Sequence, residues 1–338
     1  MQRKQVLCLL MLILFLFSST LTAEAFSYYN ARAFALGGAY TGIVDDYSAI
    51  IYNPAGLAQT GWVGLGLGST LGGETDNIGQ LVSGVRSILG DPGKILEIDL
   101  EPASIEYGHL TGVRFRTLGA GISFQGRGSI DENQLDLTHY NTFNLGYAYR
   151  VLEPFGDVAS LALGFNAKYL EGKHYRYYVE DFNDGESVVE EQTSLGNGFG
   201  VDFGIMIKLT DMVSVGAKID NVIQPFSNDG NTDYIKGSER VYTVGAGINV
   251  PLIGLTATTD LSSIPHDGGT AFRAGIEKRF FVGLLALRAG LAQEGPDTRL
   301  LTGGLGLNVG PVKADLALGF KNGAWDEPSA VFGIRANF

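Results

Sequence analysis

A two-residue alternation of apolar with small or polar side chains recurs along most of this sequence. From 199 to 207 the odd positions are Phe, Val, Phe, Ile and Ile, whereas the even positions from 200 to 208 are Gly, Asp, Gly, Met and Lys. Successive side chains of a β-strand point to opposite faces, so this period predicts strands with one apolar face and one small or polar face. The same period returns in residues 213–220, 242–249, 285–291 and 301–308.

Counting such runs predicts about fourteen strands, an even number as bacterial membrane barrels require. The predicted strands lie near 62–70, 103–109, 112–126, 139–150, 158–172, 197–208, 212–220, 240–250, 252–260, 271–279, 283–293, 299–309, 312–321 and 329–338. We therefore expect an all-β fold, a transmembrane antiparallel β-barrel with its apolar face toward lipid. Inward positions such as Gly304 and Asn308 should then tolerate a charge that Leu305 or Leu307 would resist.

The connections between these runs are predicted to alternate in length. The longer ones are Leu71–Pro102, Arg127–Thr138, Lys173–Gly196, Asn221–Glu239, Ser262–Gly269, Glu294–Asp297 and Asn322–Pro328. Tight turns are expected at Thr111, Thr210-Asp211, Pro251, Phe281 and Gly310-Pro311, with a slightly longer one at Leu152–Asp157. Short periplasmic turns opposite long external loops are typical of outer-membrane barrels. A soluble sandwich is the alternative fold, but it gives no reason for this sorting.

Composition agrees with a barrel. Hydrophobic residues make up 45% of the chain, yet after residue 25 no run approaches the 18 or so apolar residues of a membrane helix. Many of the 48 glycines lie inside the alternating runs. There they would reduce the thickness of the barrel wall, and they do not indicate flexible linkers. The formal net charge of −12 argues against nucleic acid as a partner.

The first 25 residues have the pattern of a secretory signal peptide. Arg3 and Lys4 precede an apolar run from Val6 to Phe17, and Ala23-Glu24-Ala25 suits cleavage before Phe26. The only cysteine, Cys8, lies inside that run, so the mature chain has no disulfide and no thiolate metal site. We expect a signal peptide over 1–25, a hatch over 26–60 and a barrel over 61–338, located in the outer membrane of a double-membraned, Gram-negative bacterium.

The most specific motif, ARAFALGGAYTGIVDDYSAIIYNPAGLA, covers residues 31–58. It resembles the N-terminal region of the FadL/PorV superfamily of outer-membrane barrels. The matching residues are Gly37, Gly38, Ala39, Asp45, Asp46, Asn53, Pro54, Ala55, Gly56 and Leu57. The resemblance implies a segment that sits inside the barrel as a hatch.

The physical chemistry of this motif suits a lumenal position. Gly37 and Gly38 let the backbone pass close to a wall, and Pro54 has no N–H to leave unpaired. Asp45 or Asp46 could cap a short helix that runs through Tyr52. A simple plug without gating remains an alternative to a movable hatch.

The first long loop has helical periodicity. Its apolar positions are Ile78, Leu81, Val82, Val85, Ile88 and Leu89, and Gly90-Asp91-Pro92-Gly93 follows them. This spacing predicts an amphipathic helix on the outer rim. The helix could collect a hydrophobic ligand or a partner, or simply pack over the barrel mouth.

Charged residues on the small and polar faces are expected to line the lumen. They are Lys168, Asp202, Lys208, Lys218, Asp220, Arg273, Glu277, Arg279, Arg288, Lys313, Asp315 and Arg335. Both signs occur on neighbouring strands, which favours ion pairs that also hold the hatch. No nucleophile or base stands out, so we expect neither an enzyme nor a cofactor.

The remaining motifs carry little chemistry. The histidines His109, His139, His174 and His266 lack metal-binding spacing. The acidic stretches 181–186 and 228–230 resemble calcium loops incompletely, and turn chemistry explains them as well. The last residue, Phe338, is expected to act as the signal for the outer-membrane assembly machinery.

Two functions remain open. The first is passive uptake of small hydrophobic molecules such as long-chain fatty acids, with release through a movable hatch or a lateral gap between strands. The second is a PorV-like barrel that holds exported proteins for a secretion system and transports nothing. The expected partners are outer-membrane lipid, the assembly machinery, and either a hydrophobic small molecule or secreted proteins.

Overall fold

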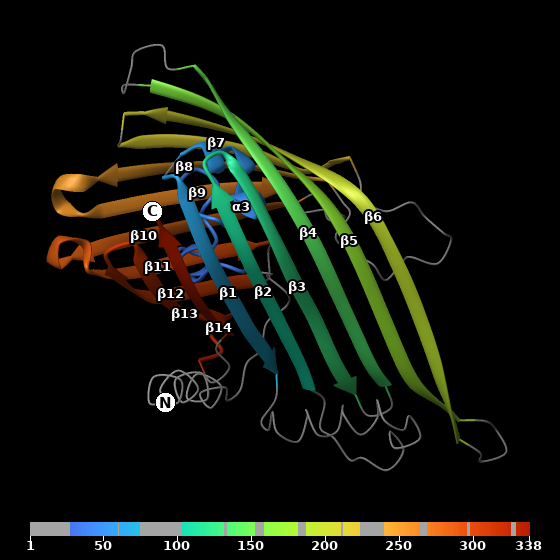
Figure 1. Ribbon diagram of the computed structural model, residues 1–338. Helices are drawn as coiled ribbons and strands as arrows, with labels where there is room; N and C mark the ends of the chain where they lie inside the picture. The colour runs from blue at the N-terminus through green and yellow to red at the C-terminus, as the bar shows by residue number, and fades with distance from the viewer. Residues whose placement is uncertain are drawn as a thin grey trace, which may run out of the picture.

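The chain forms a closed barrel of fourteen antiparallel strands (Figure 1). The computed structural model describes residues 28–59, 61–74, 103–131, 134–152, 159–181, 187–210, 212–223, 240–263, 269–295, 298–325 and 329–338. Each strand pairs with the next along the chain, and β1 pairs with β14 to close the ring. This confirms the predicted fold class.

All fourteen predicted strands are present. In chain order the elements are α2 (Ala31–Ala35), α3 (Ala49–Tyr52), the 3-10 helix η1 (Pro54–Ala58), β1 (Val63–Glu74), β2 (Ala103–Phe115), β3 (Leu118–Asp131), β4 (Gln134–Leu152), β5 (Ala159–Asp181), β6 (Ser187–Leu209), β7 (Val213–Ile223), β8 (Val241–Val250), η4 (Pro251–Ile253), β9 (Leu255–Ser263), β10 (Thr270–Phe280), η5 (Phe281–Gly283), β11 (Leu285–Glu294), β12 (Thr298–Val309), β13 (Val312–Lys321) and β14 (Ser329–Asn337). Among the residues that the structure describes, no helix is long and apolar enough to cross a membrane.

The alternation in sequence becomes an alternation between the outside and the inside of the barrel. On β6, Phe199 and Ile207 are exposed on the outer surface, whereas Asp202 and Met206 are buried inside. On β12, Leu305 and Leu307 are exposed. An apolar outer band and a small or polar inner face are what a barrel in lipid requires.

The turn predicted at Thr111 is wrong. Strand β2 continues to Phe115, and the turn falls at Arg116 and Thr117, with Arg116 at a left-handed φ of 53°. The Thr111-Gly112 pair resembles a turn, but a Cβ on Gly112 would lie 2.8 Å from the Tyr47 ring. The glycine therefore provides room for an interior side chain rather than a bend.

Two predicted loops are mostly strand. Strands β3 and β4 extend to Asp131 and from Gln134, so little of the predicted loop Arg127–Thr138 is loop. Strands β5 and β6 likewise pair as far as Asp181 and Ser187, within the predicted loop Lys173–Gly196. The apolar alternation weakens toward this end of the strands, because the outward positions include the polar pair His139 on β4 and Lys173 on β5. Backbone pairing continues beyond the apolar band, so the predicted sorting of loop lengths is incomplete.

The barrel wall is consequently uneven in height. Strands β4, β5 and β6 have 19, 23 and 23 residues, whereas β7 to β14 have 9 to 12. Figure 1 shows the long strands projecting beyond the shorter half of the barrel. The short strands enclose the interior only near the turns of one rim.

A charge on the outer face should be costly. We expect Leu305→Arg to destabilise the barrel by about 2 to 4 kcal/mol if this position lies near the bilayer midplane, because a guanidinium would enter hydrocarbon. The inward Asn308→Arg should cost only about 1 kcal/mol, from the lost hydrogen bond to the Gly283 carbonyl. Urea unfolding in liposomes measures both, and equal losses would contradict the assigned faces.

Candidate functional site

The interior of the barrel is filled by residues 28–59, which we call the lumenal segment. Its helices α2, α3 and η1 lie inside the ring of strands (Figure 1), and most of its side chains are buried. The buried apolar members are Tyr28, Tyr29, Ala31, Ala33, Phe34, Ala35, Leu36, Ala39, Tyr40, Val44, Tyr47, Ala49, Ile50, Ala55, Leu57 and Ala58. The apolar core of this protein is therefore within the lumen, between the segment and the wall.

The two predicted hatch glycines stand where the backbone turns beside the wall. Gly37 and Gly38 have φ values of 67° and 82°, in the left-handed region that favours glycine. A Cβ on Gly37 would lie 2.6 Å from the carbonyl oxygen of Leu291 on β11, and one on Gly38 would lie 2.6 Å from the Tyr28 hydroxyl. Any larger residue at either position would displace the segment.

The wall also contributes glycines to this contact. A Cβ on Gly164 would overlap the backbone of Pro54 and Ala55, and one on Gly204 would overlap the Asn53 amide. The other inward wall glycines at which a Cβ would come within 3.0 Å of the segment are Gly66, Gly68, Gly112, Gly119, Gly121, Gly146, Gly216, Gly245, Gly247, Gly275, Gly290, Gly304 and Gly319. The inner surface is thus shaped to the backbone of the segment.

This contact corrects the expectation that Gly304 tolerates a charge. A Cβ at Gly304 would lie 2.5 Å from the Cβ of Ala35 on α2 and 2.9 Å from the Leu316 carbonyl oxygen. The position faces inward as predicted, but the space beside it is occupied. An inward position is permissive only where the segment does not touch it.

Asn53 joins the segment to itself and to the wall. Its Nδ2 donates to the Thr41 carbonyl at 3.0 Å and to the Ile205 carbonyl on β6 at 3.1 Å. Its Oδ1 accepts from the N–H of Ala55 at 3.1 Å and so caps η1, with Pro54 in the first turn. Both N–H donors of this buried amide are therefore used, and its oxygen accepts one hydrogen bond.

The acidic pair has two different roles. The Asp46 Oδ1 accepts from the N–H of Ser48 at 3.0 Å and fixes the turn before α3, but neither aspartate is the N-cap, which is Ser48. Asp45 pairs with Arg32 at 3.1 Å. Burial alone would raise the pKa of Asp45, but the positive charges of Arg32 and Arg335 outweigh it and hold this pKa below its ordinary value.

Arg32 connects the segment to β10. Its Nε lies 2.9 Å from Glu277 Oε2, and its Nη1 also donates to the Tyr40 hydroxyl at 3.3 Å. The helix α2 that carries Arg32 is capped by Asn30, whose Oδ1 accepts from the N–H of Arg32 at 2.9 Å. Sequence reasoning missed both residues. The partner of Arg32 is remote in the chain, whereas Asn30 caps a helix of only five residues.

Several predicted lumenal charges form one network around Glu277. Glu277 also contacts Arg288 at 2.6 Å and Arg279 at 2.7 Å. Arg288 reaches Asp315 at 2.7 Å, and Asp315 pairs with Arg335 at 2.9 Å. Arg335 returns to the segment at Asp46, 3.6 Å away. The network therefore runs from α2 through β10, β11, β13 and β14 and back to the segment.

A second group of predicted charges lies on the side of the long strands. Asp202 accepts from Lys168 at 2.7 Å and from the N–H of Asn221 at 2.8 Å. Lys218 pairs with Asp220 at 2.7 Å and donates to the Ile51 carbonyl of the segment.

The predicted Arg273 pairs instead with Glu294 at 2.6 Å. Sequence reasoning also missed Asp260, whose Oδ2 accepts from the N–H groups of Tyr40 and Thr41 at 3.0 and 2.9 Å. Asp260 lies on the inward face of β9, so the alternation could have found it.

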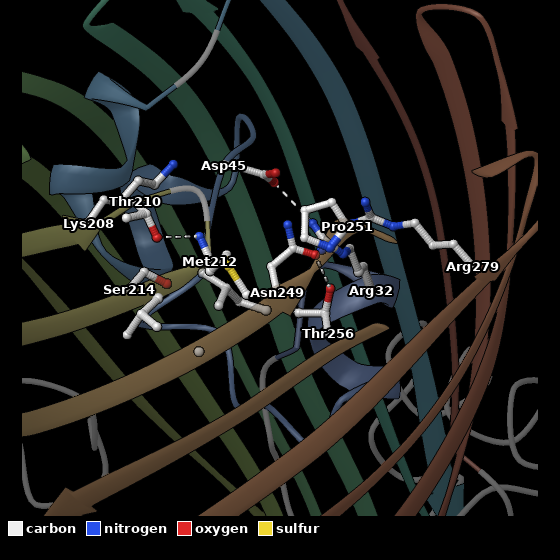
Figure 2. A pocket seen from close by; sticks show the side chains of 13 residues that line it. Arg32, Asp45, Lys208, Thr210, Met212, Ser214, Asn249, Pro251, Thr256 and Arg279 are labelled. Carbon is white, nitrogen blue, oxygen red and sulfur yellow. Dashed lines mark hydrogen bonds and ion pairs between the residues drawn. The ribbon is translucent and has the colours of Figure 1, made fainter. Parts of the chain in front are cut away.

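A cavity of about 440 Å³ adjoins residues 57–59 of the lumenal segment beside the turn at Arg116, and two further cavities adjoin the rest of it. One, of about 380 Å³, lies near the short turns and is bounded by Arg32, Ile43 and Asp45 of the segment (Figure 2). The other, of about 140 Å³, is bounded by Tyr29 and Ile51 and by polar side chains of β3 to β7. The segment thus contacts both cavities, and a molecule moving between them would have to pass it.

Two other predictions have different outcomes. The apolar helix of the first loop falls on residues 78–89, which lie outside the described residues.

Phe338 is described, and its carbonyl accepts from the N–H groups of Trp62 and Val63 at 2.8 and 3.1 Å. The terminal residue therefore helps to close the barrel between β14 and β1, while its role as an assembly signal stays a prediction.

Solved structures of low sequence identity share this architecture. The toluene transporter TodX of Pseudomonas putida superposes with a TM-score of 0.59 at 13% identity, covering 95% of this chain and 100% of that one. The fold is that of the FadL-type channels. The monoaromatic hydrocarbon channel CymD gives 0.56 at 13% identity over 94% and 99% of the chains, and a Pseudomonas aeruginosa FadL homologue gives 0.52 at 12% over 94% and 99%. No protein-family model and no curated protein sequence matches this chain.

The glycine contacts predict a specific sensitivity. We expect Gly164→Ala to destabilise the protein by about 1 to 3 kcal/mol, because its methyl group would overlap the backbone at Pro54 and Ala55. The matched control is Gly303→Ala, where the nearest atom to the new Cβ, the Arg288 carbonyl oxygen, is 3.8 Å away. Urea unfolding should show the loss only for Gly164, and similar behaviour of the two variants would contradict the tight contact.

Proposed function

We propose that this protein is an outer-membrane channel for the passive uptake of small hydrophobic molecules. It would reach the outer membrane after export and removal of residues 1–25. The observation that carries the proposal is a lumen filled by a segment that adjoins a cavity on the turn side and another among the long strands. The shared fold supports it, since the titles of the similar structures describe hydrocarbon channels and a toluene transporter. Long-chain fatty acids and monoaromatic compounds are both candidate substrates.

Passage then requires the lumenal segment to change shape. Ile43 and Asn53 are the candidates for movement, because apolar contacts hold Ile43 and neutral hydrogen bonds hold Asn53. Between them, Asp45, Asp46 and Ile51 are tied to the charged side chains of Arg32, Arg335 and Lys218. Helix α2 is instead fixed by the Arg32–Glu277 ion pair. Local rearrangement would open a path while leaving the ion network intact.

A lateral route is also supported by the wall. β7 pairs with β6 only from Val201 to Leu209, although β6 extends to Ser187. The register shifts opposite Asn221, which has a left-handed φ of 56°. Among the described residues, residues 187–200 of β6 are paired with β5 alone. A hydrophobic molecule could therefore leave the lumen laterally beside them.

A pair of disulfide locks tests the movement. In Ile43→Cys with Gly247→Cys, the Cβ atoms would be 3.6 Å apart, within the range of disulfides. Uptake of a hydrophobic probe into proteoliposomes should fall to background on oxidation and recover on reduction. The chain's only cysteine is Cys8 in the signal, so no other thiol would interfere.

The control locks the other end of the segment. Ala31→Cys with Gly333→Cys places the Cβ atoms 3.7 Å apart, and this lock should change uptake little because ion pairs already fix α2. Unchanged uptake with the Ile43 lock would overturn the proposed rearrangement. Equal uptake by liposomes with and without the protein would overturn the channel.

Loss of the Asn53 amide should affect function more than assembly. Asn53→Ala removes the hydrogen bonds to Thr41, Ile205 and Ala55, at a cost of about 1 to 3 kcal/mol. The folded barrel should still form, as judged by heat-modifiable mobility on gels, while uptake of the probe changes. Wild-type uptake by the assembled variant would exclude a gating role for this amide.

The projecting strands β4 to β6 favour the second candidate, a barrel that holds exported proteins, because they offer a surface beyond the rim (Figure 1). Changing Leu81, Val85 and Ile88 together to Ser separates the two functions. A channel that collects its ligand there should lose uptake by intact cells. A secretion barrel should show no uptake at all and should lose a protein partner in pull-down experiments.

A further inference from the structure

Two neighbouring turns on the rim of short turns carry exposed apolar side chains. Leu252 in η4, between β8 and β9, is 96% exposed, while in η5, between β10 and β11, Phe281 is 75% exposed and Val282 is fully exposed. The turns are adjacent, because the N–H of Arg279 donates to the Gly254 carbonyl at 2.8 Å. We call the apolar surface that they form the rim patch; its members are Leu252, Ile253, Phe281, Val282 and Leu284.

The backbone of η5 makes this exposure unfavourable for the isolated protein. Phe281 and Val282 have φ values of 51° and 56°, in the left-handed region that favours glycine and is rare for a β-branched residue. Most of each side chain is accessible to solvent, so contacts within the protein offset little of this cost. Contiguous apolar surface of this kind marks a site of interaction with a protein or a membrane.

The turn between β2 and β3, on the same rim, has different chemistry. Its exposed Arg116 places the guanidinium carbon 4.0 Å from the centroid of the Trp62 ring. Arginine and tryptophan are typical of the boundary between a membrane and water. The apolar turns are therefore a property of the part of the rim formed by β8 to β11, and not of every turn on it.

The rim patch continues the outer apolar face of the barrel. On β10, Phe272, Ile276 and Phe280 are exposed on this face, and Phe280 directly precedes η5. Lys278 lies on the same face, where its Nζ donates to the Ile253 carbonyl and lies 5.7 Å from the centroid of the Phe280 ring. An ammonium group has three N–H donors, so it can also bind an anionic oxygen outside the protein. An apolar surface edged by a cation is typical of elements that bind at the surface of a lipid leaflet.

We propose that the rim patch and Lys278 bind phospholipids of the periplasmic leaflet of the outer membrane. The apolar side chains lie among the acyl chains next to the head groups, and the Lys278 ammonium binds a phosphate, which is a common ligand of lysine. Lipid is favoured over a second copy of this chain or another protein, because the patch is continuous with the apolar outer face that a barrel turns toward lipid. This inference goes beyond the proposed channel and requires only that the barrel resides in the membrane.

Spin labels on single cysteines test where the rim patch lies in the membrane. The labels are attached to Leu252→Cys and to Val282→Cys in the chain without residues 1–25, which has no other cysteine. Arg116→Cys, on another turn of the same rim, is the matched control. In liposomes of phosphatidylethanolamine and phosphatidylglycerol, the ratio of collisions with oxygen to collisions with a water-soluble nickel chelate should be at least about threefold higher at 252 and 282 than at 116, because acyl chains surround the patch.

A second experiment tests the phosphate contact. The barrel is extracted from membranes, purified in detergent and assayed for bound phospholipid phosphorus. Lys278→Gln should retain at least about twofold less phosphorus than the wild type, because the cation that binds the phosphate is removed. The control Lys313→Gln makes the same charge change on the inner face of β13 and should retain as much phosphorus as the wild type.

Heat-modifiable mobility on gels shows that each variant is a folded barrel before it is measured. Labels at 252 and 282 that the chelate reaches as readily as the label at 116 would overturn the lipid contact and would indicate a surface for a protein instead. Equal phosphorus in Lys278→Gln and the wild type would overturn the phosphate contact. Neither measurement involves uptake, so the lipid surface and the channel are decided separately.

Discussion

The packing of the lumenal segment against a glycine-lined wall is the constraint on which the rest of this structure depends. A barrel of this strand number encloses more space than its own inward side chains can fill. Here the backbone of residues 28–59 occupies that space, so wall positions such as Gly164 and Gly204 have no room for a Cβ. Large apolar side chains are consequently found on the segment and on the outer surface, while the inner wall between them is thin.

Electrostatics determines which part of the segment is fixed. Removing one member of a buried ion pair typically costs about 3 to 5 kcal/mol, because the remaining charge stays buried without compensation. Arg32, Glu277, Arg288 and Asp315 are all nearly inaccessible to solvent. The network therefore specifies the position of α2 more than it adds net stability, since burying the charges was itself costly.

The sequence predicted the wall far better than the interior. Alternation is a local property, so the outward face of β6 and β12 could be read from neighbouring residues. The alternation did not predict that β5 and β6 pair as far as Asp181 and Ser187. Near that end the strands no longer have one regularly apolar face and one polar face. A turn was predicted at Thr111, beside Gly112, and Gly304 was predicted to tolerate a charge, because the contacts of a glycine are a tertiary property that its neighbours in sequence do not indicate.

The same distinction explains the residues that were missed or only partly understood. Arg32 lies within α2, and its partner Glu277 is 245 positions away in the chain. The resemblance of Asn53-Pro54-Ala55 to a family motif marked the region, but only coordinates reveal that the Asn53 amide reaches Ile205. The charged inward positions predicted that ion pairs would form. They did not indicate that several arginines would share the single carboxylate of Glu277.

The two modes of attachment bear on how a molecule could pass. Moving α2 would separate the buried Arg32 from the buried Glu277, at a cost of several kcal/mol. Releasing Asn53 from Thr41 and Ile205 breaks neutral hydrogen bonds, whose net contribution is about 1 kcal/mol each when water or another group can replace them. A passage that begins around η1 is therefore energetically favoured over one that expels the whole segment. Such a passage would also leave the ion pair of Arg32 with Glu277, and with it the position of α2, unchanged.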